Sequence, residues 1–386
     1  MPRIPHLRPV AERDLWDENL DAIGQRIRAR KLENANRRSL DIQSWRELAD
    51  MGFWRVLSSR TPRGQGATWR AFGSDLRKLA RCSGDIGFLL SAIAHAGLIR
   101  AISTWGSDEQ KERYLNRLYD GSVGATAITE TQAGSDIHGI MTCVRRTVHG
   151  FRVDGEKAHI TNAPCADLIL LVCRASDGEP NEMSLWVVET SAKGVTIGPS
   201  EAMMGNHTSP TGSIKFNDVH LTSHELLSRP GGALRILYRT IAVDRAMYAI
   251  VCAGIMENML EQALNYSLER MAFGRPIAEN QYVQKRLTDI KIAVGVSLAL
   301  GYSALEKIDA NDPEAVLSAS AAKLVATESL VAAAEHLMVI HGHKGYMAGP
   351  ISELVSDAFG TRIAGGTSDI QRVAIYEQMI RLRRQV

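Results

Sequence analysis

The chain has 386 residues, well above the roughly 100–150 residues of a single ordinary domain, and this length predicts two or three domains. Its 45 lysines and arginines almost balance its 43 aspartates and glutamates, and the net charge of +2 excludes nucleic-acid binding driven by bulk charge. The five scattered cysteines contain no C-x-x-C pair, which fits a reducing cytoplasm and disfavours disulfide frameworks and zinc cages. No unbroken apolar run approaches the ~18 residues that span a bilayer, so we expect neither a membrane nor a nucleic-acid partner.

The first third of the chain has the character of a helical domain, which we place at residues 1–120. Apolar side chains recur there at helical spacing, and β-branched runs are few. Residues 85–100 (DIGFLLSAIAHAGLIR) predict a mostly buried helix. Ser107, followed by Glu109 and Gln110, predicts the start of the next helix.

The middle of the chain, residues 121–230, changes to short strands separated by turns. Asp154-Gly155 predicts the turn of a hairpin, and residues 168–172 (LILLV) predict a fully buried strand. Helical patterns of about 10–15 residues, which would connect parallel strands, do not separate these segments. We therefore expect an antiparallel β-barrel or sandwich and not a parallel sheet of the kind that binds dinucleotides.

The last part of the chain, residues 231–386, predicts long helices that pack together. Apolar residues recur every three or four positions between Tyr248 and Tyr266, and again between Val283 and Leu298. The other faces of both helices carry too few charges for fully exposed surface helices, so a bundle is the simplest interpretation. The predicted fold class is α+β, with a β domain between two helical domains along the chain.

Four polar segments are candidates for ligand contacts, and each has a purely structural alternative. AITETQAGSD at residues 127–136 gathers hydroxyls and backbone N–H groups that could line a cofactor, or it forms a plain turn after a strand. Thr161 could donate to a ligand, or it is only a favoured strand residue. Arg270 in RMAFGRP could bind a diphosphate, or it lies on a solvated turn between helices. Thr367 or Ser368 could cap the final helix while the N–H groups ahead face a ligand.

His336, His341 and His343 form a cluster of possible metal ligands. Their surroundings favour a helix C-terminus with Gly342 and Gly345 as caps, so we assign no metal. The chain lacks G-x-G-x-x-G after a strand, G-x-x-x-x-G-K-[ST], G-x-S-x-G and H-E-x-x-H. The standard nucleotide-binding folds and the serine hydrolases therefore have no support.

Four segments together resemble the acyl-CoA dehydrogenase family of flavoenzymes. In chain order they are ATAITETQAGSDIHGI, EKAHITNAPCADLILLV, ERMAFGRPIAENQ and TRIAGGTSDIQR. They stand in the order and spacing of that family, and the resemblance covers nearly the whole chain after about residue 40. It implies an N-terminal helical domain, a middle antiparallel β-barrel, a C-terminal four-helix bundle, non-covalent FAD, and a homotetramer built as a dimer of dimers.

The resemblance also implies two groups of FAD contacts. In the β domain, the expected contacts are Thr126, Ile128 and Thr129 at the pyrimidine edge, Ser135 near the pyrophosphate, and Thr161 at flavin N5, the atom that accepts hydride. His159 stands where the family often has tryptophan beside the flavin. The second group comprises Arg270, Phe273 and Gln281, which would reach the FAD of a neighbouring subunit, and Thr367 with Asp369 near the end of the chain.

The catalytic base departs from the common pattern of the family. Most members have Glu-Gly-Thr where this chain has Gly365-Gly366-Thr367, so the usual carboxylate is absent. The family's second solution places a Glu on a bundle helix immediately before an Arg, and the matching residues here are Asp244 and Arg245, 26 positions before Arg270. The resemblance implies Asp244 as the base and the Gly365 N–H as a donor to the substrate carbonyl. Alternatively, Asp244 is an acid at a helix N-terminus, stabilised by the helix dipole.

The function that the resemblance implies is FAD-dependent oxidation of the Cα–Cβ bond of a thioester. The thioester would sit on a phosphopantetheine arm, either of CoA or of an acyl or peptidyl carrier protein. The missing Glu, together with ITNAPCAD and TSPTGSIKFND, looks most like the dehydrogenases of prolyl or aminoacyl groups on carrier proteins in secondary metabolism. The alternatives are a flavin monooxygenase of the same fold and a non-catalytic binding protein that kept the fold.

Overall fold

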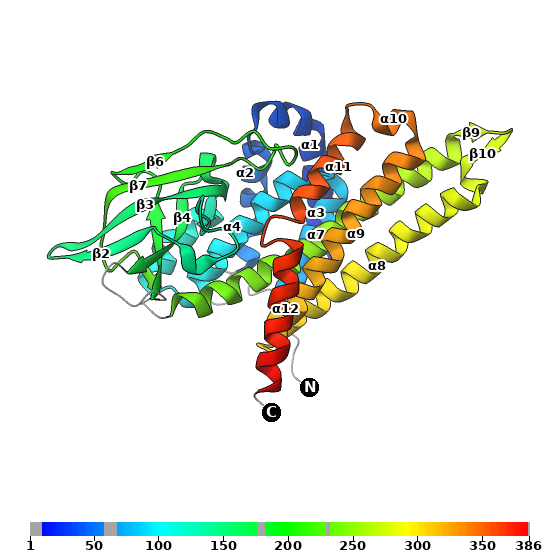
Figure 1. Ribbon diagram of the computed structural model, residues 1–386. Coiled ribbons are helices and arrows are strands. Elements are labelled where there is room, and N and C mark those ends of the chain that lie inside the picture. Colours follow the sequence, from blue (N-terminus) through cyan, green and yellow to red (C-terminus); the bar gives the residue numbers. More distant parts are fainter. Residues whose placement is uncertain (1–9, 58–67, 176–181, 229–231, 385–386) are drawn as a thin grey trace.

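The computed structural model in Figure 1 describes residues 10–57, 68–175, 182–228 and 232–384. Helices come first along the chain, then strands, then helices again, and this predicted order is confirmed. The N-terminal helices are α1 (Val10–Arg37), α2 (Ile42–Asp50), the 3-10 helix η1 (Phe53–Leu57), α3 (Trp69–Ser83), α4 (Ile86–Trp105), α5 (Asp108–Gln110), the π-helix η2 (Lys111–Leu115) and α6 (Asn116–Tyr119).

Helix α4 is the central element of the N-terminal part and is buried on nearly every side. Its first turn is closed by Asp85, whose carboxylate accepts a hydrogen bond from the Phe88 amide at 3.0 Å. Ser107 begins α5 with a capping box to Gln110, as predicted. Because α4 is apolar all round, it can pack simultaneously against the β domain and the C-terminal helices.

The middle domain is a mostly antiparallel sheet in the order β6-β7-β3-β2-β4-β5-β8. Two of its pairings are parallel, β1 with β4 and β2 with β4, so the prediction of a purely antiparallel domain was wrong in this respect. The strands are β1 (Gly124–Ala127), β2 (Cys143–Thr147), β3 (Gly150–Thr161), β4 (Leu168–Ala175), β5 (Met183–Glu189), β6 (Val195–Ile197), β7 (Thr211–Leu221) and β8 (Leu226–Ser228). The short 3-10 helices η3 (Ile137–Gly139) and η4 (Ala163–Cys165) lie between strands.

The predicted hairpin turn at Asp154-Gly155 is also wrong, because these residues lie inside β3. The turn between β2 and β3 is at Val148-His149, and the pairing of β3 with β7 shifts register between Val153 and Gly155. Gly155 has φ +148°, and a Cβ there would lie 2.6 Å from Thr142. The glycine therefore serves a bulge and a close strand approach, which a sequence pattern cannot distinguish from a turn.

The C-terminal part consists of long helices that lie side by side (Figure 1). They are α7 (Ala233–Glu269), α8 (Gln281–Asp309), α9 (Ala315–His341), α10 (His343–Tyr346), α11 (Pro350–Thr361) and α12 (Ser368–Arg383). Strands β9 (Met271–Ala272) and β10 (Arg275–Pro276), with the 3-10 helix η5 (Ile277–Glu279), form the connection between α7 and α8. The residues of α4, α7, α8 and α9 share one apolar core, whereas the sheet has a second core of its own.

Three helices are long and apolar enough to cross a membrane by length and composition alone: Ile86–Trp105, Gln281–Asp309 and Ala315–His341. The sequence predicts no such segment, because no unbroken apolar run in it approaches ~18 residues. In these helices small polar residues and a few charged ones, such as Arg100 and Lys323, interrupt the apolar runs, while the mean hydropathy of an 18-residue window stays high. The apolar window of α4 is 83% buried inside the protein, whereas those of α8 and α9 are 28% and 39% buried. The apolar character of α4 is thus accounted for by internal packing, and α8 and α9 keep open apolar faces.

Candidate active site

Helix α4 holds the ends of two strands of the β domain together. The Asn162 side chain, just after β3, donates to the carbonyls of Ser91 on α4 and Gly124 on β1 at 3.0 and 2.9 Å. The amide of Gly124 in turn donates to His95 Nδ1 at 3.0 Å. One turn of α4 therefore holds the start of β1 and the end of β3 together.

The predicted flavin residues of β1 and β3 lie side by side in this arrangement. The Ala158 amide donates to the Thr129 carbonyl at 2.9 Å, which joins the segment after β1 to the end of β3. The hydroxyl of Thr126 is buried and has no hydrogen-bond partner among the described residues. A buried hydroxyl is normally paired, so this one is available to a bound group. Thr161, the last residue of β3, is half-buried.

A buried ion pair fixes the segment that carries Ile128 and Thr129. Lys157 on β3 donates to Glu130 and to the Ile128 carbonyl, both at 2.9 Å. The Glu130 carboxylate also accepts from the backbone amides of Met141 and Thr142 at 2.7 and 2.9 Å. The Glu130 carboxylate thus accepts hydrogen bonds from both Lys157 on β3 and the amides of Met141 and Thr142. These bonds fix both ends of the loop between Glu130 and Thr142 against β3.

Ser135 and His159 lie at the exposed border of the same region. Ser135 is in the turn before η3 and is exposed. His159 has φ +57°, and its Nδ1 lies 3.0 Å from the Glu201 carboxylate. The bulge of β3 between Lys157 and Ile160 therefore turns the imidazole outward, toward the loop between β6 and β7 that carries Glu201.

Asp244 is the twelfth residue of α7, so it is not an acid at a helix N-terminus and that alternative is excluded. Its carboxylate faces Gly97 on α4, where a Cβ would lie 3.1 Å from Oδ1. The side chain keeps a small accessible surface, yet its carboxylate accepts no hydrogen bond and forms no ion pair within the described part of the chain. Burial raises the pKa of Asp244 to about 7, although the charges of Arg100 and Arg245 oppose the rise.

Arg100 shares this region with Asp244 but does not form an ion pair with it at contact distance. Its guanidinium lies over the Trp69 ring at 4.9 Å, and its Nε is buried without a hydrogen-bond partner among the described residues. Burial lowers the pKa of Arg100 to about 10, partly offset by Asp244 and Asp309. The group therefore stays cationic at neutral pH and adds positive charge beside Asp244.

Three side chains hold the turn at Gly365 and Gly366 by its carbonyl oxygens. Arg245 Nε lies 3.5 Å from the Gly365 oxygen, and Lys323 Nζ donates to the Gly366 oxygen at 2.6 Å. Gln371 Nε2 donates to both oxygens, at 3.2 and 2.9 Å. Arg245 is itself fixed by a bond of 2.9 Å from Nη1 to the Ser320 hydroxyl on α9.

The side of Gly365 that would bear a Cβ is filled by Tyr248, one turn after Asp244 on α7. A Cβ at position 365 would lie 3.0 Å from the Tyr248 ring, and Gly365 has φ +69°. A glutamate at this position would therefore be strained and would collide with Tyr248. The amide of Gly365 makes no hydrogen bond within the described residues, and the residue is exposed. The turn thus offers a free N–H in place of the usual carboxylate.

The second group of predicted FAD residues does not join the first within one chain. Arg270, Phe273 and Gln281 lie at the tip between α7 and α8, which Figure 1 places away from the sheet. Phe273 is 97% exposed and has φ +52°. Thr367 and Asp369 are at the start of α12, where the Thr367 hydroxyl caps the helix by accepting from Ile370 at 3.3 Å. The N-cap expected at Thr367 is therefore present.

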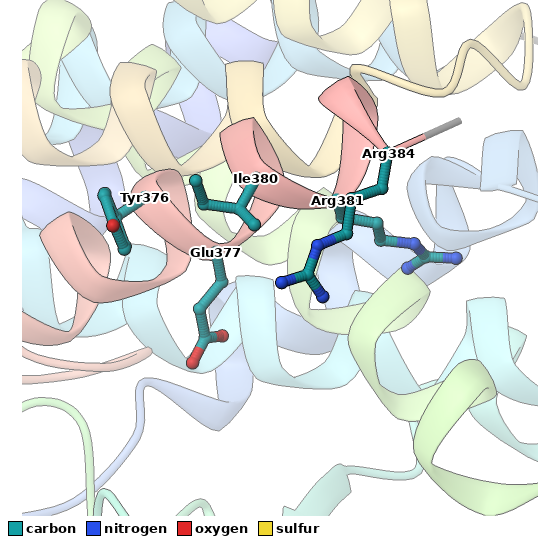
Figure 2. A pocket seen from close by; sticks show the side chains of 5 residues that line it. All are labelled: Tyr376, Glu377, Ile380, Arg381 and Arg384. Atoms are coloured by element: carbon teal, nitrogen blue, oxygen red, sulfur yellow. The ribbon is translucent and has the colours of Figure 1, made fainter. Parts of the chain in front are cut away.

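A groove of about 430 Å³ lies along α12, beyond the turn at Gly365. Figure 2 shows its lining, which is Tyr376, Glu377, Ile380, Arg381 and Arg384. Burial raises the pKa of Tyr238 on α7, and the charge of Glu377, which lines the groove, adds to the rise. Within the described residues no group of three or more His, Cys, Asp or Glu could hold a metal ion.

Each of the three parts of the chain matches a domain of a known protein family. The N-terminal, middle and C-terminal domains of acyl-CoA dehydrogenases match residues 12–122, 125–219 and 231–380. The chain belongs to the acyl-CoA dehydrogenase family. An acyl-CoA dehydrogenase of Bacillus subtilis is 31% identical over 82% of this chain and 84% of its own length.

Two solved structures show the same fold over almost the whole chain. Butyryl-CoA dehydrogenase from Megasphaera elsdenii is 25% identical with a TM-score of 0.91, and the match covers 98% of this chain and 100% of that one. The prolyl acyl carrier protein oxidase AnaB is 24% identical with a TM-score of 0.87, covering 96% and 100%. The predicted fold class, with its helical, β and helical domains, is thereby confirmed.

Membership makes the protein an FAD-dependent oxidoreductase that acts on the Cα–Cβ bond of thioesters. The residues present fit the cofactor, because the orphaned Thr126 hydroxyl and the half-buried Thr161 lie on β1 and β3, which the bonds of Asn162 and Glu130 hold in place. Thr126, Ile128, Thr129, Ser135 and Thr161 would hold the flavin end of FAD. The individual roles of these residues stay predictions.

Several residues of this site were missed by the sequence reasoning. They are Gly97, Arg100, Glu130, Tyr248, Lys157, Lys323 and Gln371. Lys323 had a visible signal, a single lysine in the apolar run SASAAKLVATESL. Gly97 and Tyr248 had none, because their role depends on which helix lies opposite.

Proposed function

We propose that this acyl-CoA dehydrogenase oxidises an acyl or aminoacyl thioester carried on a phosphopantetheine arm, with Asp244 as the catalytic base. The proposal rests on the environment of Asp244. Its carboxylate is buried and unpaired, its pKa is raised to about 7, and Gly97 opposite leaves room for it. A general base is most effective when its pKa is near the working pH. Asp244 meets this condition without a carboxylate at position 365.

The chemistry divides between the chain and the cofactor. FAD, when bound, accepts the hydride that leaves the β-carbon. Asp244 takes the α-proton as the Cα–Cβ double bond forms, so one proton and one hydride leave the substrate. The N–H of Gly365 donates to the thioester carbonyl oxygen, where negative charge develops during proton removal. Arg245 holds the turn that presents this N–H.

CoA and carrier proteins both hold the acyl group on a phosphopantetheine arm. The proposal therefore names this arm and does not choose between the two carriers. The likeness to a CoA-acting enzyme and to a carrier-protein oxidase is similar in identity and supports both carriers equally. A role in secondary metabolism stays a prediction.

We further propose a homo-oligomer, arranged as a dimer of dimers, in which Arg270, Phe273 and Gln281 complete the FAD site of a neighbouring subunit. Their distance from the β domain of the same chain supports this, as does the exposure of large apolar side chains around them. Phe273 is 97% and Tyr282 is 79% exposed, which is unusual for such side chains on a free surface.

The proposal is tested with a panel of acyl- and aminoacyl-thioesters on CoA and on carrier proteins, scored by mass spectrometry for loss of two hydrogens. We expect one acyl class to be oxidised by the wild type and not by Asp244→Asn. Insertion of oxygen into a substrate would instead support a monooxygenase of the same fold, and oxidation at equal rate by both proteins would reject Asp244 as the base.

A further inference from the structure

Lys323 is a buried amine without an anionic partner. Its side chain is fully buried, and no carboxylate lies within ion-pair distance of Nζ in the described parts of the chain. The groups around it are the Gly366 carbonyl, the Tyr248 ring at 5.6 Å, Arg245 and the thiol of Cys252. Burial lowers the pKa of Lys323 to about 7, and Arg245 lowers it further, whereas Cys252 opposes the change. A buried amine without a carboxylate partner lowers the stability of the fold, so its presence indicates a functional role.

The contacts of Lys323 fix the direction of the peptides after Gly365. Lys323, Arg245 and Gln371 draw the oxygens of Gly365 and Gly366 toward α7, α9 and α12. Across a trans peptide the C=O and the following N–H point in opposite directions. The N–H groups of Gly366 and Thr367 must then point away from these donors. Neither of them, nor the Gly365 N–H, has an acceptor within the described residues.

We infer that Lys323 is a positioning residue: it holds the carbonyls of the diglycine turn back, so that the turn presents only N–H donors to the thioester oxygen. The inference rests on the proposed function and deepens it. In most of the family a glutamate at position 365 would place a negative charge at this turn. Here the side chain is absent, and the Arg245 guanidinium and the Lys323 amine lie behind the turn. The turn is therefore suited to stabilise the enolate oxygen that forms when the α-proton leaves.

The test separates this role from the role of Asp244. Acetoacetyl-pantetheine has an acidic α-carbon, so its enolate forms at equilibrium without an enzymic base and is read from its ultraviolet absorbance. We measure the enolised fraction of the probe bound to the FAD-loaded protein in wild type, Lys323→Met and Lys323→Gln. Asp244→Asn is measured as well, and it should still favour the enolate because the turn is intact.

Lys323→Met should lower the ionisation ratio of the bound probe by about 10- to 100-fold, the usual size of an effect transmitted through one supporting residue. Its thermal midpoint should be equal to or above that of the wild type, because a buried amine whose charged form has no carboxylate partner has been removed. Lys323→Gln keeps a donor for the Gly366 oxygen and should recover part of the loss. It also provides the test if the methionine variant does not fold.

The matched control is Thr327→Val, one turn further along α9. Thr327 is fully buried, but its hydroxyl bonds only carbonyls of its own helix, at 3.0 and 3.4 Å. This variant should ionise the probe like the wild type. The inference is overturned if Lys323→Met enolises the probe like the wild type. It is also overturned if FAD content or the thermal midpoint falls together with enolisation, since the lysine would then have only a structural or cofactor-holding role.

Discussion

Replacing Asp244 with asparagine should abolish dehydrogenation and, at the same time, make the folded protein more stable above neutral pH. Asparagine keeps the size of the side chain but cannot take up a proton. The rate should fall by at least ~10²–10⁴-fold, the usual contribution of a general base. A carboxylate with a structural role would show the opposite stability effect, because its replacement would remove a favourable partner.

The size of the stabilisation follows from the pKa of Asp244. Its folded-state pKa is raised from 3.8 to about 7, mainly by burial. Between these two values the folded protein holds a proton that the unfolded chain has lost, so the free energy of unfolding falls as pH rises. At about 1.4 kcal/mol per pKa unit, the complete loss above pH 7 is about 4 kcal/mol at most. Asp244→Asn lacks this loss, whereas at pH 4 the two proteins should be nearly equal.

Thermal unfolding of both FAD-loaded proteins at pH 5 and pH 8 measures this difference. We expect the midpoint of Asp244→Asn to exceed that of the wild type at pH 8 by several degrees, with a smaller gap at pH 5. An asparagine variant that unfolds at the wild-type temperature at pH 8, or below it, would refute the assignment of a buried, unpaired carboxylate.

Four further predictions follow from the same geometry. In the pH profile of the dehydrogenation rate, kcat/KM should rise through about pH 7 as Asp244 loses its proton, whereas a profile already flat at pH 5.5 would contradict the raised pKa. Gly97→Ala should lower kcat by ~10²-fold at unchanged FAD content, because its Cβ would lie 3.1 Å from Asp244 Oδ1; normal turnover would show that the carboxylate acts elsewhere. Arg270→Ala should reduce flavin occupancy, measured by absorbance, by an order of magnitude or more, and a saturated monomer would disprove the shared site. Gly365→Glu should not rescue Asp244→Asn, because φ +69° and the Tyr248 ring oppose the side chain; recovery of activity in the double variant would show that the turn rearranges.

The order of domains and the local features of single elements could be predicted from the sequence. The α4 segment was recognisable because it is apolar on all sides, and the helix starts at Ser107 and Thr367 follow from residue type and position alone. Asp244 could be located only through the resemblance, since a lone Asp-Arg pair on a helix has no pattern of its own.

The contacts between distant segments could not be predicted. Gly155 reads as a turn residue, and only the approach of Thr142 on the neighbouring chain segment shows that it belongs to a bulge. The pairing of Glu130 with Lys157 joins residues 27 positions apart, and the filling of the Gly365 site by Tyr248 depends on how α7 lies against the last turn. Each of these is decided by tertiary packing, which periodicity and residue preference do not encode.

One measurement tests most directly whether Asp244 is the catalytic base. The thioester that the panel identifies is added anaerobically to the FAD-loaded enzyme, and flavin absorbance is followed in a rapid-mixing instrument. The yellow flavin of the wild type should bleach in a single turnover. Asp244→Asn, with the same FAD content, should bleach at least ~10²-fold more slowly. If the flavin of the asparagine variant bleaches as fast as that of the wild type, Asp244 is not the catalytic base.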